Sequence, residues 1–233
     1  MGKTYVIIPA CNEEKRLPNI LKTMEQCINK KIIDNVIIVN DGSTDKTREI
    51  IKRFSEKSKK ITGIEFKKNV GMGGAIMKAI DVIHRNADAE VIAKIDADLK
   101  GLTVEHVEKL INPIKTKKTP LTIANFAHAN RSGIRAYRAD FILSIVRNQK
   151  NSAFLKKIGS KFDTALIVLF RLENNGKNPE HKVIKWENVD HLWVGEGDTA
   201  MYRSVDIAHN PRKESEEQLF KWFVKKHKHG RRL

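Results

Sequence analysis

The stretch Val36-Ile37-Ile38-Val39-Asn40-Asp41-Gly42-Ser43-Thr44-Asp45 contains the signals that decide the fold. Its first four residues are β-branched, as in a buried strand. The next three have the composition of a turn, and the last three are residues that cap helices. Ile50, Ile51 and Phe54 then share one helical face. The stretch therefore predicts a strand that passes through a tight turn into a helix.

The same alternation of short β-branched runs and helical apolar stripes extends over the first 126 residues. The strand-like runs are residues 5–8, 61–66 and 91–95, and the helical stripes are residues 20–24, 75–83 and 104–111. Alternating strands and helices indicate βαβ units and parallel pairing. We expect an α/β protein with a mostly parallel central sheet and helices on both faces.

The remaining residues follow a less regular pattern. We expect strands at residues 121–126 and 181–186, helices at residues 139–147, 162–173 and 212–228, and a long loop at residues 187–200. No internal repeat or Pro/Gly/Ser linker separates them from the first half. A single domain over residues 1–233 is the simplest organisation.

Composition restricts the class of protein. The 233 residues are 40% hydrophobic, enough for a core, and carry a net charge of +16, which favours phosphates, nucleic acid or an anionic membrane surface. Two cysteines exclude a disulfide framework. No signal-peptide pattern and no run of about 18 apolar residues is present. We expect a soluble, basic, cytoplasmic protein.

Asp96-Ala97-Asp98 follows the expected strand at residues 91–95. Residues two apart in an extended chain point the same way, so both carboxylates can face one cation. Hard divalent ions take oxygen ligands from one or two carboxylates and from substrate phosphates. Alternatively, the acidic pair turns the chain or caps the next helix, with Lys94 and Lys100 partly neutralising it.

Two other strand ends carry groups suited to a nucleotide. Asp41 can accept two N–H groups from the edge of a base, or it can serve as a turn residue. The run Gly71-Met72-Gly73-Gly74 opens a helix, so its free backbone N–H groups can face a phosphate; glycine is also common at tight βα turns. The Rossmann fingerprint after the first strand and the P-loop sequence are both absent, which excludes those two classes.

Four segments resemble, in order, the motifs of family 2 glycosyltransferases, which have the GT-A fold: residues 6–14, 36–45, 69–74 and 95–99. The resemblance implies that Asp41 contacts the base and that Asp96 and Asp98 hold Mg²⁺ or Mn²⁺ against the diphosphate of a nucleotide sugar. It implies a nucleotide site made of Pro9, Ala10, Asn12, Glu13, Asp41, Gly71, Gly74, Lys78, Asp96 and Ala97.

The second half is similar to the same family over residues 132–140, a segment that lies on the acceptor side in dolichyl- and polyprenyl-phosphate sugar transferases. This similarity implies acceptor-side roles for Arg135 and Arg138. His191 resembles a histidine that some related enzymes place on the metal, or it is a surface loop histidine. A hydroxyl acceptor would need a general base, for which Asp140 and Asp163 are candidates. Asp163 can equally be a helix cap.

The expected function is metal-dependent transfer of a sugar from a UDP- or GDP-sugar, with inversion, to a polyprenyl phosphate or to a small phosphorylated or hydroxyl acceptor. Asp98 is the leading catalytic residue, through the metal. The helix at residues 212–228 either contacts the inner membrane face or packs on the domain. The alternatives are a basic binding protein on an inactive scaffold and a sugar nucleotidyltransferase. No specific nucleic acid is expected, because recognised motifs are missing.

Overall fold

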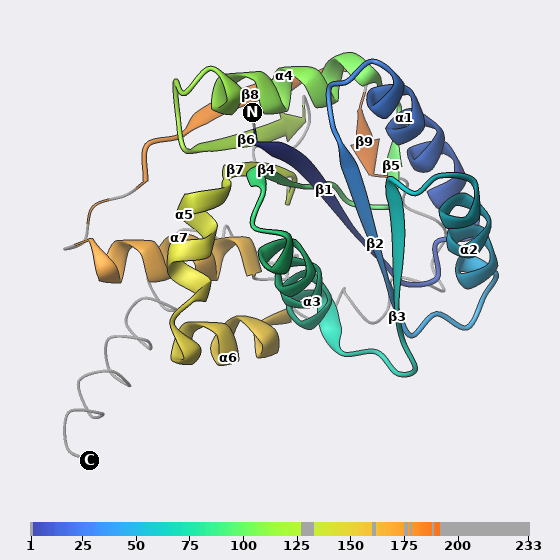
Figure 1. Ribbon diagram of the computed structural model, residues 1–233, viewed down its shortest axis with the longest axis horizontal. Coiled ribbons are helices and arrows are strands. Elements are labelled where there is room, and N and C mark those ends of the chain that lie inside the picture. Colours follow the sequence, from blue (N-terminus) through green and yellow to red (C-terminus); the bar gives the residue numbers. More distant parts are fainter. Residues whose placement is uncertain are drawn as a thin grey trace, which may run out of the picture.

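The computed structural model describes residues 2–126, 133–159, 162–174, 177, 179–187 and 189–191, with the side chains of Phe126, Asp190 and His191 excepted. The described residues form a seven-stranded sheet with the order β3-β2-β1-β4-β7-β6-β8 (Figure 1). Its strands are β1 (Lys3–Ala10), β2 (Asn35–Asp41), β3 (Ile61–Phe66), β4 (Ala89–Lys94), β6 (Leu121–Phe126), β7 (Arg135–Arg138) and β8 (Lys182–Trp186). The expected mostly parallel sheet is confirmed.

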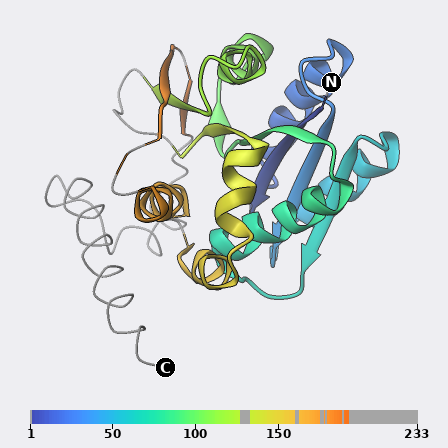
Figure 2. The same cartoon turned by 60° about the vertical axis from the view of Figure 1, so that its left-hand side comes forward.

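Seven helices of the described chain cover both faces of this sheet (Figures 1 and 2). They are α1 (Leu17–Asn29), α2 (Thr47–Lys57), α3 (Gly71–Asn86), α4 (Val104–Lys115), α5 (Ala139–Val146), α6 (Gln149–Lys157) and α7 (Phe162–Glu173). One apolar core joins the sheet to α1, α2 and α4, and a second joins it to α3, α5, α6 and α7. The alternating residues of β1 divide between the two, with Val6 and Ile8 in the first core and Tyr5 and Ile7 in the second.

Side-chain hydrogen bonds satisfy free N–H groups at the starts of α4 and α2. Thr103 accepts a hydrogen bond from the backbone N–H of His106, and the His106 side chain accepts one from the Thr103 N–H, so the pair forms a capping box. At α2 the Asp45 carboxylate accepts the Thr47 N–H at 2.9 Å. Ser43 and Thr44 instead bond to Asn12 in the neighbouring loop, so α2 begins at Thr47.

The second half contains elements that the sequence pattern did not predict. Strand β7 pairs antiparallel with both β4 and β6, whereas β6 and β8 are parallel. Helix α6 was also not expected. A two-stranded ribbon joins β5 (Leu99–Lys100) to β9 (Asp190–His191), and β9 lies within residues 187–200, which we expected to be a long loop. The expected helix at residues 212–228 lies outside the described residues.

Glycines at the start of α3 allow this helix to meet the end of α6. A Cβ atom at Gly73 would overlap the Leu155 carbonyl oxygen and lie 3.3 Å from the Gly159 nitrogen. At Gly74 the nearest obstacle is a Val70 methyl group, at 2.9 Å. The carbonyl end of α6 therefore lies directly against the amino end of α3, an arrangement that also aligns their dipoles favourably.

We expect Gly73→Ala to destabilise the fold by about 1–3 kcal/mol, the usual cost of overpacking. Alanine is the better helix former by about 1 kcal/mol, so a loss of stability would show that the backbone contact outweighs propensity. The measurement is the free energy of unfolding in urea. Gly74→Ala is the matched control: its nearest contacts are atoms of the exposed Val70 side chain, and the closest backbone atom of α6 is farther away, at 3.6 Å, so the loss should be clearly smaller. Equal stability of both variants would contradict the packing argument.

Candidate functional site

The candidate site lies at the edge of the sheet where β1, β2 and β4 end. β1 pairs in parallel with β2 on one side and with β4 on the other, so all three carboxyl ends meet there. Ligands of open α/β sheets bind at this edge. The last residues of β1 supply Pro9 and Ala10, the last residue of β2 is Asp41, and the segment after β4 supplies Asp96 and Asp98.

The loops after β1 and β2 are held together by reciprocal hydrogen bonds. Asn12 has a left-handed backbone conformation (φ 58°), and its Oδ1 atom accepts the Thr44 N–H at 2.8 Å. The Ser43 hydroxyl accepts the Asn12 N–H at 3.0 Å, and the Thr47 hydroxyl accepts the Glu13 N–H at 2.7 Å. Because side chains of one loop bond to the backbone of the other, Asn12 and Glu13 have fixed positions at the edge of the site.

Asp41 connects the end of β2 to the start of α3. Its side chain is buried (4% exposed), and Oδ1 accepts the Val70 N–H at 2.6 Å. The next residue, Gly42, has φ 72°, and a Cβ atom there would lie 2.5 Å from the Asn69 nitrogen. Only glycine fits this turn. The turn interpretation of Asp41 is therefore present in the structure, and contact with a base stays a prediction.

The residues proposed from the glycine-rich run lie next to Asp41. Gly71 has φ 82° and begins α3, with its N–H donated to the Asn69 side chain at 3.0 Å. Gly74 is half-buried in the same turn, and Lys78 is exposed on the same helix. The structure thus groups Asp41, Gly71 and Gly74 closely, while Lys78 lies a full turn beyond Gly74.

Asp96 and Asp98 are half-buried residues directly beyond β4, separated by the buried Ala97. Asp96 lies two residues past the end of β4, and Ala97 and Asp98 lie in the turn that leads into β5, so the extended geometry expected for this pair is not present. Lys94, the last residue of β4, places its ammonium group 2.7 Å from Asp96 Oδ1. The alternative that a flanking lysine partly neutralises the acidic pair is confirmed for Lys94; Lys100 is exposed.

Glu13 reaches the same region from the β1–α1 loop. Burial raises the pKa of its carboxyl group to about 7, and the nearby carboxylates of Asp98 and Asp45 add to the rise, although Arg16 opposes it. The Arg16 guanidinium is bonded to Glu13 Oε2. The carboxyl groups of Glu13 and Asp98 are therefore close enough to influence each other's ionisation.

The donor chemistry at this edge fits a hard divalent cation. Asp96 and Asp98 offer carboxylate oxygens, the ligands that Mg²⁺ and Mn²⁺ take together with substrate phosphates. No group of three or more potential metal ligands exists within the described part of the chain. The two aspartates therefore provide a partial site, which oxygens of a bound diphosphate would complete.

A buried charge cluster lies beneath Asp96, between the sheet and α7. Besides Asp96, Lys94 contacts the Gly133 carbonyl oxygen at 2.8 Å and Asp163 Oδ2 at 3.4 Å. Burial alone would lower the pKa of Lys94, but Asp96 and Asp163 outweigh burial and raise it. Asp163 also accepts the Tyr137 hydroxyl at 2.6 Å and lies 3.6 Å from Arg135 Nε. With three donors around it, Asp163 is better suited to balancing charge than to acting as a base.

The antiparallel direction of β7 separates two residues that the sequence placed together. Arg135 pairs with Lys94 at the site edge, whereas Arg138 pairs with Val91 near the opposite end of β4. Asp140 lies beyond Arg138 and bonds to it at 2.6 Å, exposed to solvent. The structure therefore brings Arg135 to the site and places Arg138 and Asp140 away from it.

The backbone of His191 lies close to the acidic pair. In the β5–β9 ribbon, His191 pairs with Leu99, the residue that follows Asp98. Its side chain is outside the described residues, so metal coordination by His191 stays a prediction. In the sequence only the identity of His191 pointed to this position. Strands of two residues, such as β5 and β9, leave no periodic pattern of apolar residues.

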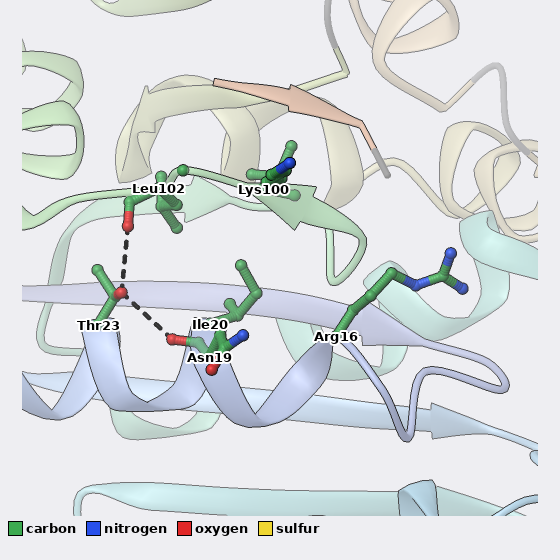
Figure 3. Close-up of a pocket in the computed structure, with 8 residues that line it drawn as sticks. Arg16, Asn19, Ile20, Thr23, Lys100 and Leu102 are labelled. Atoms are coloured by element: carbon green, nitrogen blue, oxygen red, sulfur yellow. Dashed lines mark hydrogen bonds between the residues drawn. The ribbon is translucent and has the colours of Figure 1, made fainter. Parts of the chain in front are cut away.

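A small pocket lies between α1 and the segment that follows Asp98. It has a volume of about 110 Å³ and is lined by Arg16, Asn19, Ile20, Thr23, Leu99, Lys100, Gly101 and Leu102. Figure 3 shows the Thr23 hydroxyl between the carbonyl oxygens of Asn19 and Leu102, at 3.3 Å from each. This volume is below the roughly 300 Å³ of ordinary ligand pockets, and no carboxylate lines it. We therefore place the candidate site at the sheet edge.

Comparison with known proteins agrees with this architecture. Residues 5–176 match the family model described as glycosyl transferase family 2. The chain belongs to glycosyltransferase family 2. This match confirms the family resemblance of the sequence motifs.

Curated relatives of this glycosyltransferase are lipid-phosphate sugar transferases. It is 31% identical to the human dolichyl-phosphate beta-glucosyltransferase over 139 residues, 55% of this chain and 42% of that protein. It is 33% identical to the UDP-N-acetylglucosamine–dolichyl-phosphate N-acetylglucosaminyltransferase of Methanococcus voltae over 122 residues, 47% of this chain and 46% of that protein. The chain thus spans less than half the length of these relatives.

A solved structure with a similar fold is the glucosyl-3-phosphoglycerate synthase of Mycobacterium tuberculosis in complex with Mn²⁺, UDP and phosphoglyceric acid. The TM-score is 0.63 at 15% identity, covering 82% of this chain and 70% of that one. The likeness confirms the GT-A fold. Among the described helices of the glycosyltransferase, none is long and apolar enough to span a bilayer.

The raised pKa of Glu13 predicts a specific dependence of stability on pH. A carboxyl group whose pKa is higher in the folded state stabilises the fold below its ordinary pKa of 4.5, and loses this contribution as the pH rises through about 7. Relative to Glu13→Gln, the wild type should therefore lose stability between pH 5 and pH 8. Urea unfolding with EDTA present measures this difference.

The control is Glu105→Gln. A hydrogen bond from Lys109 lowers the pKa of Glu105, so any pH effect of this substitution should fall below about pH 4.5. A wild-type and Glu13→Gln difference that is constant from pH 5 to pH 8 would contradict the burial argument.

Proposed function

We propose that this glycosyltransferase transfers a sugar from a UDP-sugar to a lipid-linked phosphate acceptor and that it uses Mg²⁺ or Mn²⁺. The observation that carries the proposal is the convergence of Asp41, Asp96 and Asp98 at the carboxyl edge of the parallel strands. A nucleic-acid groove would not favour carboxylates there, which argues against the basic binding protein as the alternative.

The donor position follows from the groups along this edge. The Asp41 carboxylate can accept further hydrogen bonds beside the one from the Val70 N–H, so it can accept N–H groups from a base. The loop containing Asn12 and Glu13 is fixed by the β2–α2 loop and forms one wall of the nucleotide site. UDP is favoured as the nucleotide because the names of one curated relative and one structural neighbour include it.

The metal would be held by Asp96 and Asp98, with His191 as a further candidate. When bound, the divalent ion supplies Lewis-acid stabilisation of the charge that develops on the departing diphosphate. Asp98 lies in a fixed turn between the buried Ala97 and β5, so its carboxylate is held near the edge where that diphosphate would lie.

The acceptor side would be marked by Arg135. Its guanidinium is buried beside Asp163, and among the described residues its Nε and Nη1 atoms have no hydrogen-bond partner. An anion next to it would satisfy these donors, and a phosphate acceptor needs no general base because it is already ionised. The names of the dolichyl-phosphate relatives favour a polyprenyl phosphate. Peripheral membrane contact through residues 212–228 lies outside the described chain and stays a prediction.

The test is binding of UDP by thermal shift and calorimetry, with and without Mn²⁺, followed by transfer from UDP-glucose and UDP-N-acetylglucosamine to a short polyprenyl phosphate. Wild-type protein should show a Mn²⁺-dependent increase in Tm with UDP, since a ligand that binds only the folded state stabilises it. Folded protein that binds neither UDP nor GDP under any metal condition would overturn the proposal.

Asp98→Asn should abolish the Mn²⁺-dependent part of the UDP shift and reduce turnover by at least about 100-fold, as expected for a lost transition-state interaction. The Tm without ligand should change little, because the side chain is half-buried at an edge. Glu56→Gln is the control: it removes one carboxylate charge from the exposed face of α2. Normal metal dependence in Asp98→Asn would refute the metal assignment.

A further inference from the structure

Lys94 is a buried cation on the donor side of the candidate site. It is 3% exposed, and its ammonium group has three close oxygen partners: Asp96 Oδ1 at 2.7 Å, the Gly133 carbonyl at 2.8 Å and Asp163 Oδ2 at 3.4 Å. The Gly133 contact is a hydrogen bond, and the two carboxylate contacts are ion pairs. A buried lysine held in this way occupies one position, because leaving it would expose unpaired charges.

The backbone of Gly133 closes the cluster from the opposite side. A Cβ atom at this glycine would lie 2.7 Å from Lys94 Nζ and 3.3 Å from Asp96 Oδ2. The absence of a side chain therefore allows the chain to pass directly over the ion pair. Lys94 contacts Oδ1 of Asp96, and Gly133 lies near Oδ2. The Asp96 side chain is 14% exposed.

The charges of this cluster balance without any metal. Lys94 and Arg135 carry two positive charges, and Asp96 and Asp163 carry two negative charges. A divalent cation near Asp96 would thus meet a carboxylate that already has a counter-ion, and it would be repelled by Lys94 at short range. A donor diphosphate would bring further negative charge and further oxygen ligands to the same edge.

We propose that Lys94 is a resident counter-ion of Asp96 that makes binding of the divalent cation depend on the diphosphate of the donor. This inference rests on the proposed function, because it concerns the same donor site. Lys94 is a positioning residue in this scheme: it acts through Asp96. The metal enters together with the nucleotide, and little of it is bound to the protein alone.

The variant that tests this is Lys94→Met, which removes the charge and keeps an unbranched chain. Asp163 keeps the Tyr137 hydroxyl and Arg135 as partners, so the remaining buried carboxylate stays paired. Lys94→Gln is the second variant, because its amide can still donate to the Gly133 carbonyl. Lys115→Met is the matched control: Lys115 bonds to a backbone carbonyl, that of Ile32 at 2.7 Å, and it lies outside the site.

The readout is Mn²⁺ binding measured by electron paramagnetic resonance, without UDP and with saturating UDP, corrected for Mn²⁺ chelated by free UDP. In wild-type protein and in Lys115→Met, UDP should tighten Mn²⁺ binding by at least about fivefold, the low end of usual coupling between two ligands. In both Lys94 variants, Mn²⁺ should bind at least about fivefold more tightly without UDP, and the effect of UDP should shrink.

Reciprocity gives an independent check. The factor by which UDP tightens Mn²⁺ binding must equal the factor by which Mn²⁺ tightens UDP binding, so calorimetric titration of UDP should show the same reduction in the Lys94 variants. A lysine that served only the fold would change the Tm and leave this factor unaltered.

Three outcomes separate the two proposals. Lys94 variants that bind Mn²⁺ no more tightly than wild type without UDP overturn the role of Lys94 and leave the proposed function intact. Wild-type protein that binds Mn²⁺ equally with and without UDP overturns the role of Lys94 without any variant. Wild-type protein that binds neither Mn²⁺ nor UDP refutes the proposed function, and the inference with it.

Discussion

The parallel pairing of β1 with β2 and with β4 is the constraint on which the candidate site depends. Because the three strands run in one direction, Ala10, Asp41 and Lys94 all end at one edge of the sheet. Chain segments that are some 30 to 85 residues apart in sequence therefore contribute neighbouring side chains. With an antiparallel β1, the loops after β1 and β2 would lie at opposite ends, and the bonds from Asn12 and Glu13 to the β2–α2 loop could not form.

Gathering carboxylates at one edge has an electrostatic cost, and each of them is stabilised in a different way. Asp41 accepts a backbone N–H, so it is held by a neutral dipole. Glu13 pairs with Arg16 and has a pKa of about 7. Asp96 has a full countercharge in Lys94. These three carboxyl groups thus have partners within the protein alone, and a cation with its nucleotide would join an existing arrangement. The site is organised before any ligand arrives.

Much of the first half could be predicted from the sequence because its signals are local. The strand, turn and helix around Asp41 are encoded in residues 36–54, and the Thr103 cap needs only the next three residues. The Lys94–Asp96 contact was foreseeable for the same reason, since both residues belong to one strand end. Its extension to Asp163 was not, because that contact joins residues nearly 70 positions apart.

The second half resisted prediction for physical reasons that differ between elements. β7 has four residues with arginine at each end, so it lacks an apolar run, and its direction is set only by pairing with β4 and β6. That direction decides which arginine reaches the site. α6 buries only Asn151 and Leu155, which leaves almost no periodic stripe. Its place is determined by the glycine contact with α3, a feature of shape that composition does not reveal.

The position of α7 shows what a buried polar cluster can contribute to this fold. The helix buries apolar side chains on several sides, Phe162, Leu166, Val168 and Leu169 among them, and such contacts tolerate small rotations and shifts. Asp163 does not tolerate them, because it must meet Tyr137, Lys94 and Arg135 together or leave a charge unpaired. Breaking such a buried pair typically costs about 3–5 kcal/mol. One carboxylate therefore fixes the register of α7 on the sheet, and through Lys94 it fixes that helix relative to Asp96. Charged contacts therefore join the sheet edge of the candidate site to α7. Apolar packing alone would fix their alignment less firmly.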